Sequence, residues 1–108
     1  MKRSTRLAIL GVAVALPWLL NAQHSPLHSY TPPNGFVPDS ITAIRIATAV
    51  WTPIYGDRQI QSEQPYRANL HDGIWTVEGT LPADAKGGVA VAEIAKRDAR
   101  IIRVSHGK

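Results

Sequence analysis

An uninterrupted apolar run lies near the start of the chain, and apolar and polar positions alternate in later segments. The run covers the 14 residues Leu7–Leu20, follows three basic residues and precedes the small Ala22. This order is typical of an export signal peptide, here residues 1–22. Because a bilayer-crossing helix needs about 20 residues, the pattern favours a cleaved signal over an uncleaved membrane anchor.

Proline dominates the pattern after the signal. Four of residues 24–38 are proline, and one is glycine. Because proline lacks a backbone donor and fixes φ, residues 23–37 are predicted to form an extended arm. We expect Phe36 and Val37 to attach the end of this arm to the core.

A helical period begins after Asp39, whose side chain can cap the first turn. Apolar residues then recur three and four positions apart, and Gly56 is a natural stop. The stripe consists of Ile44, Ala47, Trp51 and Ile54, and is widened by Ala43, Ile46 and Val50. The pattern predicts one helix ending at Tyr55, with a kink or a tight last turn at Pro53.

The period changes to two from Gln64, after a polar stretch, Asp57–Glu63, that is predicted to be a linker. Asp72-Gly73 favours a two-residue hairpin turn. Centring a hairpin there puts apolar residues on one face and an opposite-charge pair on the other. The predicted pairs are His71–Ile74, Leu70–Trp75, Ala68–Val77 and Arg67–Glu78.

Two further strands are predicted, at Val89–Lys96 and Arg100–His106. A three-residue loop joins them and would hold Ala99 in the left-handed conformation, at a cost of about 1 kcal/mol. The resulting pairs are Ala92–Val104, Glu93–Arg103 and Ile94–Ile102.

The predicted fold class is α+β, with one N-terminal helix packed on a curved four-stranded antiparallel meander. This single domain spans residues 38–108. The connection Leu81–Gly88 leaves the register between the second and third strands open. One allowed register places Glu78 beside Glu93, which would form a charged row of Arg67, Glu78, Glu93 and Arg103 across the four strands.

Removal of the signal changes the apparent basicity of the chain. The full sequence has 12 Lys and Arg and 8 Asp and Glu, but three of the basic residues lie in the signal, which leaves a net charge of +1. Charge therefore gives no support to nucleic-acid binding. The absence of cysteine excludes disulfides and zinc–thiolate sites, so packing alone must stabilise the exported domain.

Few residues are candidates for catalysis. Glu78 and Glu93 could divide the acid and nucleophile roles of glycoside cleavage, but neighbouring arginines would favour the ionised form of both carboxyls. His24 and His28 have the spacing of helical metal ligands, yet Pro26 between them opposes a helix. We therefore assign no catalytic residue, no metal site and no cofactor.

Two regions could bind a partner. Core-facing aromatic residues could line a small-ligand pocket between helix and sheet, although such residues more often simply pack; they are Trp51, Tyr55, Tyr66 and Trp75. On the outer face of the sheet, apolar side chains mix with charges as they do in protein-docking patches. The candidate partner-binding residues there are Glu78, Val91, Glu93 and Arg103.

Three stretches carry a resemblance to a known family: residues 37–56, 72–82 and 87–108. Their sequences are similar to those of bacterial immunity proteins with a nuclear-transport-factor-2-like fold, and the similarity covers nearly all of the mature chain. Ala99 departs from the glycine expected in that family. The resemblance implies a protein that binds a cognate toxin of a polymorphic toxin system and blocks it without catalysis.

With the signal peptide, this resemblance predicts a periplasmic immunity protein that is not stably inserted in the membrane after signal cleavage. Two alternatives stay open: a small-ligand carrier with a pocket near Trp51 and Trp75, and an envelope hydrolase that uses Glu78 and Glu93. The pattern specifies neither the toxin nor the oligomeric state.

Overall fold

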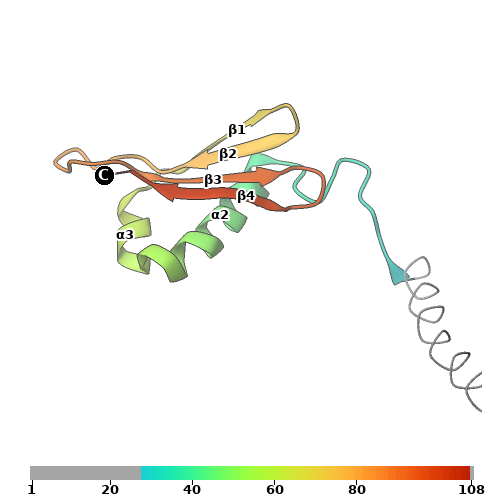
Figure 1. Cartoon of the computed structure of the whole chain (residues 1–108), viewed down its shortest axis with the longest axis horizontal. Helices are drawn as coiled ribbons and strands as arrows, with labels where there is room; N and C mark the ends of the chain where they lie inside the picture. Colours follow the sequence, from blue (N-terminus) through green and yellow to red (C-terminus); the bar gives the residue numbers. More distant parts are fainter. Residues whose placement is uncertain (1–27, 108) are drawn as a thin grey trace, which may run out of the picture. The chain divides into compact units, whose positions relative to one another are not determined.

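The computed structural model describes residues 28–107 (Figure 1). The predicted signal peptide, residues 1–22, lies outside these described residues, as do His24 and the first part of the predicted arm. The helices and strands named below belong to one compact unit that begins at Pro32.

The main helix, α2, is Ser40–Tyr55, and its predicted cap and end are confirmed. Asp39 Oδ1 accepts hydrogen bonds from the Thr42 amide at 2.8 Å and from the Thr42 hydroxyl at 2.6 Å. These bonds satisfy a donor that the first helical turn leaves unpaired. The helix continues through Pro53, and Gly56, at φ 96°, ends it.

A second, short helix, α3, is Asp57–Ser62, where the sequence pattern predicted a linker. The Gln61 side-chain amide donates to both carboxylate oxygens of Asp57, at 3.1 and 3.2 Å, and so links successive turns. Ile60 is the apolar residue of this helix, and it is buried. A single apolar position has no period, which is why the pattern could not reveal this helix.

Four strands form one antiparallel meander in chain order: β1 Arg67–His71, β2 Ile74–Glu78, β3 Ala90–Ala95 and β4 Ile101–His106. The helix α2 packs against β1, β2 and β3. Both helices lie on the same side of the sheet (Figure 1). The predicted arrangement of one main helix on a four-stranded antiparallel sheet is therefore confirmed.

The hairpin of β1 and β2 has the predicted register, with Arg67 opposite Glu78 and Leu70 opposite Trp75. Both turn residues have positive φ, 49° at Asp72 and 75° at Gly73. A two-residue turn whose twist matches the strands needs this conformation, and aspartate followed by glycine adopts it readily.

The register between β2 and β3, which the sequence left open, is not the allowed one that would place Glu78 beside Glu93. Glu78 lies opposite Val91, and Glu93 lies opposite Thr76, so the row of four charges does not form. The ladder continues one pair beyond Glu78, where the Gly79 amide donates to the Ala90 carbonyl at 3.0 Å. The two registers differ by two residues and keep the same side chains on each face, so strand alternation alone could not choose between them.

The loop between β3 and β4 is one residue longer than predicted. The Ala95 amide donates to the Arg100 carbonyl at 2.9 Å, so residues 96–99 form the loop. The Ala99 amide turns back to the Ala95 carbonyl, also at 2.9 Å. Ala99 has the predicted left-handed conformation, with φ 65°.

The longer loop shifts the pairing beside it. Ile94 lies opposite Ile101 and not opposite Ile102 as predicted. A register shift between Glu93 and Ile94 absorbs the extra residue. Beyond this shift the predicted pairs Ala92–Val104 and Glu93–Arg103 are confirmed.

Val37 joins the segment before α2 to the sheet. Its amide donates to the Lys96 carbonyl at 3.0 Å, and its carbonyl accepts from Trp75 Nε1 at 2.8 Å. The Val37 side chain is fully buried, whereas that of Phe36 is half exposed. Val37 thus attaches this segment as expected, through backbone bonds on both sides of its buried side chain.

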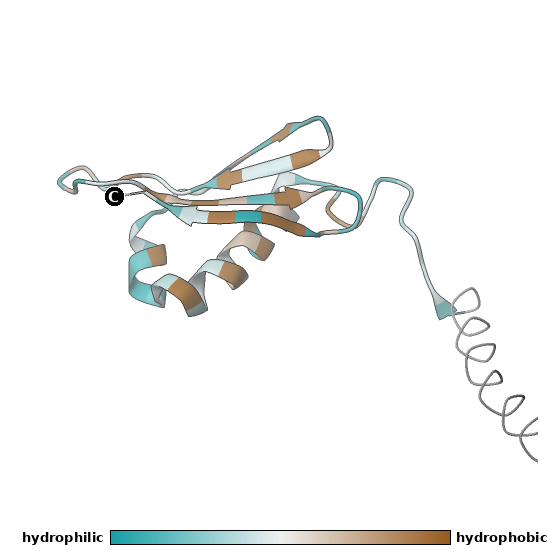
Figure 2. Ribbon diagram, viewed as in Figure 1, coloured by the Kyte–Doolittle hydropathy of each residue, from teal (hydrophilic) through white to brown (hydrophobic). Residues whose placement is uncertain are grey.

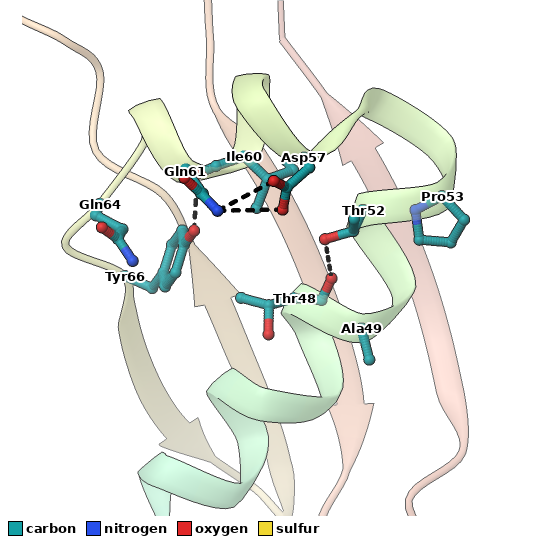
Figure 3. Close-up of a pocket in the computed structure, with 9 residues that line it drawn as sticks. All are labelled: Thr48, Ala49, Thr52, Pro53, Asp57, Ile60, Gln61, Gln64 and Tyr66. Atoms are coloured by element: carbon teal, nitrogen blue, oxygen red, sulfur yellow. Dashed lines mark hydrogen bonds between the residues drawn. The ribbon is translucent and has the colours of Figure 1, made fainter.

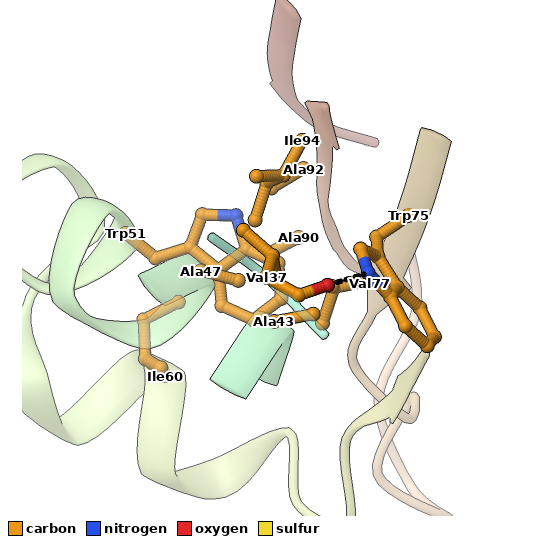
Figure 4. Close-up of a cluster of buried hydrophobic side chains, with 10 residues drawn as sticks. All are labelled: Val37, Ala43, Ala47, Trp51, Ile60, Trp75, Val77, Ala90, Ala92 and Ile94. Carbon is orange, nitrogen blue, oxygen red and sulfur yellow. Dashed lines mark hydrogen bonds between the residues drawn. The ribbon is translucent and has the colours of Figure 1, made fainter. Parts of the chain in front are cut away.

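The core lies between α2 and the sheet (Figure 4). Apolar segments of α2 and of the strands alternate with polar ones along each element (Figure 2). The buried members include Ala43, Ala47 and Trp51 of the helix and Val77, Ala92 and Ile94 of the sheet. Ile54 is 57% exposed, so the buried stripe of α2 is shorter than the sequence predicted.

Candidate functional site

The outer face of the sheet holds the four candidate partner-binding residues. Successive side chains of a strand point to opposite faces, and Val77 and Ala92 are buried on the helix side. The neighbouring positions therefore face away from the helices. Of the four candidates there, Glu78, Val91 and Glu93 are partly buried and Arg103 is exposed. We call this surface the outer face.

Two separate ion pairs occupy the outer face. Arg67 Nη2 lies 3.3 Å from Glu78 Oε1, and Arg103 Nη2 lies 3.1 Å from Glu93 Oε2. The hydrogen bond to Glu93 raises the pKa of Arg103 further above its already high ordinary value. Each carboxylate is bound to its own arginine, and the two glutamates do not lie directly opposite each other on β2 and β3.

The four candidate pocket residues are packed in different ways. Trp51 is fully buried and its ring contacts that of Tyr66, with centroids 5.8 Å apart. Trp75 is 7% exposed, and its ring nitrogen is bound to Val37. The Tyr66 hydroxyl donates to the Ile60 carbonyl at 2.7 Å. These contacts give three of the aromatic residues a structural role.

A surface hollow of about 530 Å³ lies beside α2 and α3 (Figure 3). Tyr66 lines it, whereas Trp51, Tyr55 and Trp75 do not. Polar groups in its wall are bonded to one another, as in the Asp57–Gln61 contact. The hollow is thus distinct from the pocket that sequence reasoning placed between helix and sheet.

A cluster that sequence reasoning missed is centred on Glu63, at the end of α3. The Glu63 side chain is 1% exposed, and its carboxylate accepts three hydrogen bonds. Ala90 N–H donates to Oε1 at 2.7 Å, Gln59 Nε2 donates to Oε2 at 2.8 Å, and His106 Nε2 lies 2.7 Å from Oε2. These contacts join α3 to β3 and β4.

His106 contacts acceptors through both of its ring nitrogens. Nδ1 lies 2.8 Å from the Gly107 carbonyl oxygen, while Nε2 faces the Glu63 carboxylate. A carbonyl and an ionised carboxylate can only accept, so satisfying both contacts needs the doubly protonated imidazolium. The ring also lies against Tyr55, with centroids 5.1 Å apart.

The electrostatics of the two groups are complementary. Burial raises the pKa of Glu63, but the bonds from Ala90, Gln59 and His106 outweigh it and leave the pKa below its ordinary value of 4.5. The hydrogen bond to Glu63 raises the pKa of His106 above its ordinary 6.5, the Gly107 carbonyl adds to this, and partial burial opposes it. Both shifts favour the charged pair.

A family model described as NTF2 fold immunity protein matches residues 42–108, well over half of the chain. The chain belongs to this family. The resemblance noted from the sequence is therefore confirmed. The matched residues contain most of α2, all of α3 and the whole sheet.

Two curated relatives of this chain come from Escherichia coli K12. The uncharacterised protein YhhH is 36% identical over 73 residues, which are 67% of this chain and 58% of YhhH. The uncharacterised protein YbbC is 34% identical over 67 residues, which are 61% of this chain and 55% of YbbC. The chain thus spans little more than half the length of either relative. No solved structure matches it significantly.

Within residues 28–107, no three His, Cys, Asp or Glu side chains are grouped in a way that could hold a metal ion. The helices in this part of the chain also lack the length and apolar character that a membrane crossing requires.

Proposed function

We propose that this immunity protein acts in the periplasm, where it binds a cognate bacterial toxin through the outer face of its sheet and blocks it without catalysis. Membership of the NTF2 fold immunity protein family is the observation that carries this proposal. The export signal predicted in residues 1–22 supports the compartment.

The chemistry of the outer face suits a protein partner. Exposed surface ion pairs contribute about 0–1 kcal/mol each, so Arg67–Glu78 and Glu93–Arg103 can exchange partners at little cost. Val91 lies between these pairs, opposite Glu78, and is only partly buried. A face that mixes partly exposed apolar groups with exchangeable charges supports docking to a complementary protein surface.

Binding kinetics with the purified cognate toxin, sought among the products of the neighbouring genes, would test the surface. Arg103→Glu places a second negative charge beside Glu93, and we expect dissociation about 10-fold faster or more. Arg58→Glu on α3, which is also exposed but lies on the helix side, is the matched control and should leave the rate unchanged.

A charge swap separates folding from recognition. The double variant Glu93→Arg/Arg103→Glu restores an ion pair across the two strands but reverses its direction. If the toxin contacts these charges, the swap should bind as poorly as Arg103→Glu. Full recovery of affinity in the swap would exclude the outer face as the toxin-binding surface, and an absence of binding by the unmodified chain would contradict the function itself.

A further inference from the structure

The Glu63–His106 contact connects parts of the chain that are far apart in sequence. Thr80 lies just after β2, and its amide donates to the Glu63 backbone carbonyl at 2.6 Å. Its carboxylate holds Ala90, the first residue of β3, and His106, the last residue of β4. A single residue therefore holds the ends of three strands against the end of α3.

The chain packs closely around this junction at two glycine positions. A Cβ at Gly79 would lie 2.6 Å from Glu63 Oε1. Gly88 and Gly107 approach so closely that a Cβ at Gly88 would collide with the Gly107 backbone. Close approach at two glycine positions indicates a built junction and not an accidental surface contact.

We propose that Glu63 and His106 form a pH-sensitive clasp, which joins the ends of β3 and β4 to α3 and loosens when the imidazole loses a proton. A neutral imidazole has only one N–H, so it must give up either the carboxylate or the Gly107 carbonyl. In both cases Glu63 is left buried without a cation, which is costly.

Among the groups around His106, the Glu63 carboxylate is the charge that controls the protonation of the imidazole. The ring of Tyr55 in α2 packs on the His106 ring, and Ala90 lies opposite His106 on β3. Gln59 of α3, which also binds the Glu63 carboxylate, is neutral. Lys86 lines the same hollow of about 350 Å³ as His106, and is the other charged residue in its wall. Apart from Glu63, these described neighbours supply no anion for the imidazolium.

Hydrogen exchange of the free protein tests the clasp, followed residue by residue by NMR and corrected for the intrinsic pH dependence of exchange. The reporters are the amides of Thr80, Ala90 and Gly107, and the Trp75 amide in the first hairpin is the reference. As pH rises through the titration of His106, protection at the reporters should fall about 10-fold or more relative to the reference.

Two histidine variants make the test specific. His106→Gln removes the titration, so the three reporters should show the protection that wild type has at high pH, at every pH. His71→Gln is the matched control, because His71 also faces a carboxylate, Asp72 at 3.2 Å, but both side chains are almost fully exposed. It should behave as wild type. Equal pH dependence in wild type and His106→Gln would overturn the clasp.

Ring NMR of the wild-type protein covers the case in which His106→Gln does not fold. Both ring nitrogens of His106 should keep their protons to a higher pH than those of an ordinary histidine. Loss of the proton at or below the ordinary pKa of 6.5 would contradict the proposal. All readouts use the free protein, so they do not depend on the proposed toxin binding.

Discussion

Gly79 is the residue at which packing constrains the sequence most directly. Glu63 occupies the space beside it, with Oε1 and Cβ only 2.6 and 2.8 Å from where a Gly79 Cβ would stand. The Glu63 side chain cannot retreat without losing the bonds to Ala90, Gln59 and His106.

We expect Gly79→Ala to lower the free energy of unfolding by about 1–3 kcal/mol, as overpacking of a filled site does. Urea denaturation would measure the loss. The shorter Glu63→Asp should reduce the cost of the added methyl group, so the two substitutions should be non-additive in a double-mutant cycle. A neutral Gly79→Ala would mean that Glu63 does not fill this space.

The charges of Glu63 and His106 predict how stability varies with pH. Because the pKa of Glu63 is lowered, its contribution is present above 4.5 and is lost as pH falls through the folded value. Because the pKa of His106 is raised, its contribution is full below 6.5 and is lost as pH rises through the folded value. Stability from this pair is therefore greatest between these limits.

Substitution of His106 should remove the decrease in stability that its loss of a proton causes as pH rises above 6.5. Because the buried Glu63 carboxylate loses its cation, His106→Gln should cost about 2–3 kcal/mol near pH 6 and progressively less as pH rises. Urea unfolding at a series of pH values would provide the comparison. Curves for wild type and variant that stay parallel above pH 6.5 would exclude this account of the pair.

Among the elements, the loop between β3 and β4 carries the clearest strain. Ala99 has φ 65°, a conformation that costs a residue with a Cβ about 1–2 kcal/mol. Ala99→Gly should relieve this conformational strain. The greater flexibility of glycine in the unfolded chain should offset part of the gain in stability. We expect a net gain of roughly 0.5–1 kcal/mol in thermal or urea unfolding. Destabilisation would mean that the alanine methyl contributes more through packing.

The elements differ in how far local sequence determines them. The register of the first hairpin could be predicted because the Asp72-Gly73 turn and the Arg67–Glu78 pair agree. The register of β2 with β3 could not, because Glu63, 27 residues before Ala90, holds the start of β3. No local pattern reveals a contact of that kind, and the short helix that ends beside Glu63 had no period to detect.

The candidate site divides in the same way. Alternation along the strands placed Glu78, Val91, Glu93 and Arg103 on one face, because alternation depends only on strand geometry. The contact between Glu63 and His106 spans 43 residues, so the sequence could not show it. An isolated acid after a polar stretch and a histidine near the end of a strand were the only signals available.

At the scale of the whole molecule, the proposed compartment makes a separate prediction. Deletion of residues 1–22 should keep the protein in the cytoplasm and abolish protection from a toxin that acts outside it. Binding of the purified proteins should be unchanged, because the described fold begins after this segment. Protection by the cytoplasmic form would contradict a periplasmic site of action.

Survival of bacteria that export the toxin tests directly whether this protein protects against it. Bacteria would export the proposed cognate toxin to the periplasm, together with the full chain, with the Glu93→Arg/Arg103→Glu swap, or with neither. We predict survival with the full chain and killing in the other two strains. Equal killing with and without the full chain would contradict its assignment as the immunity partner of that toxin.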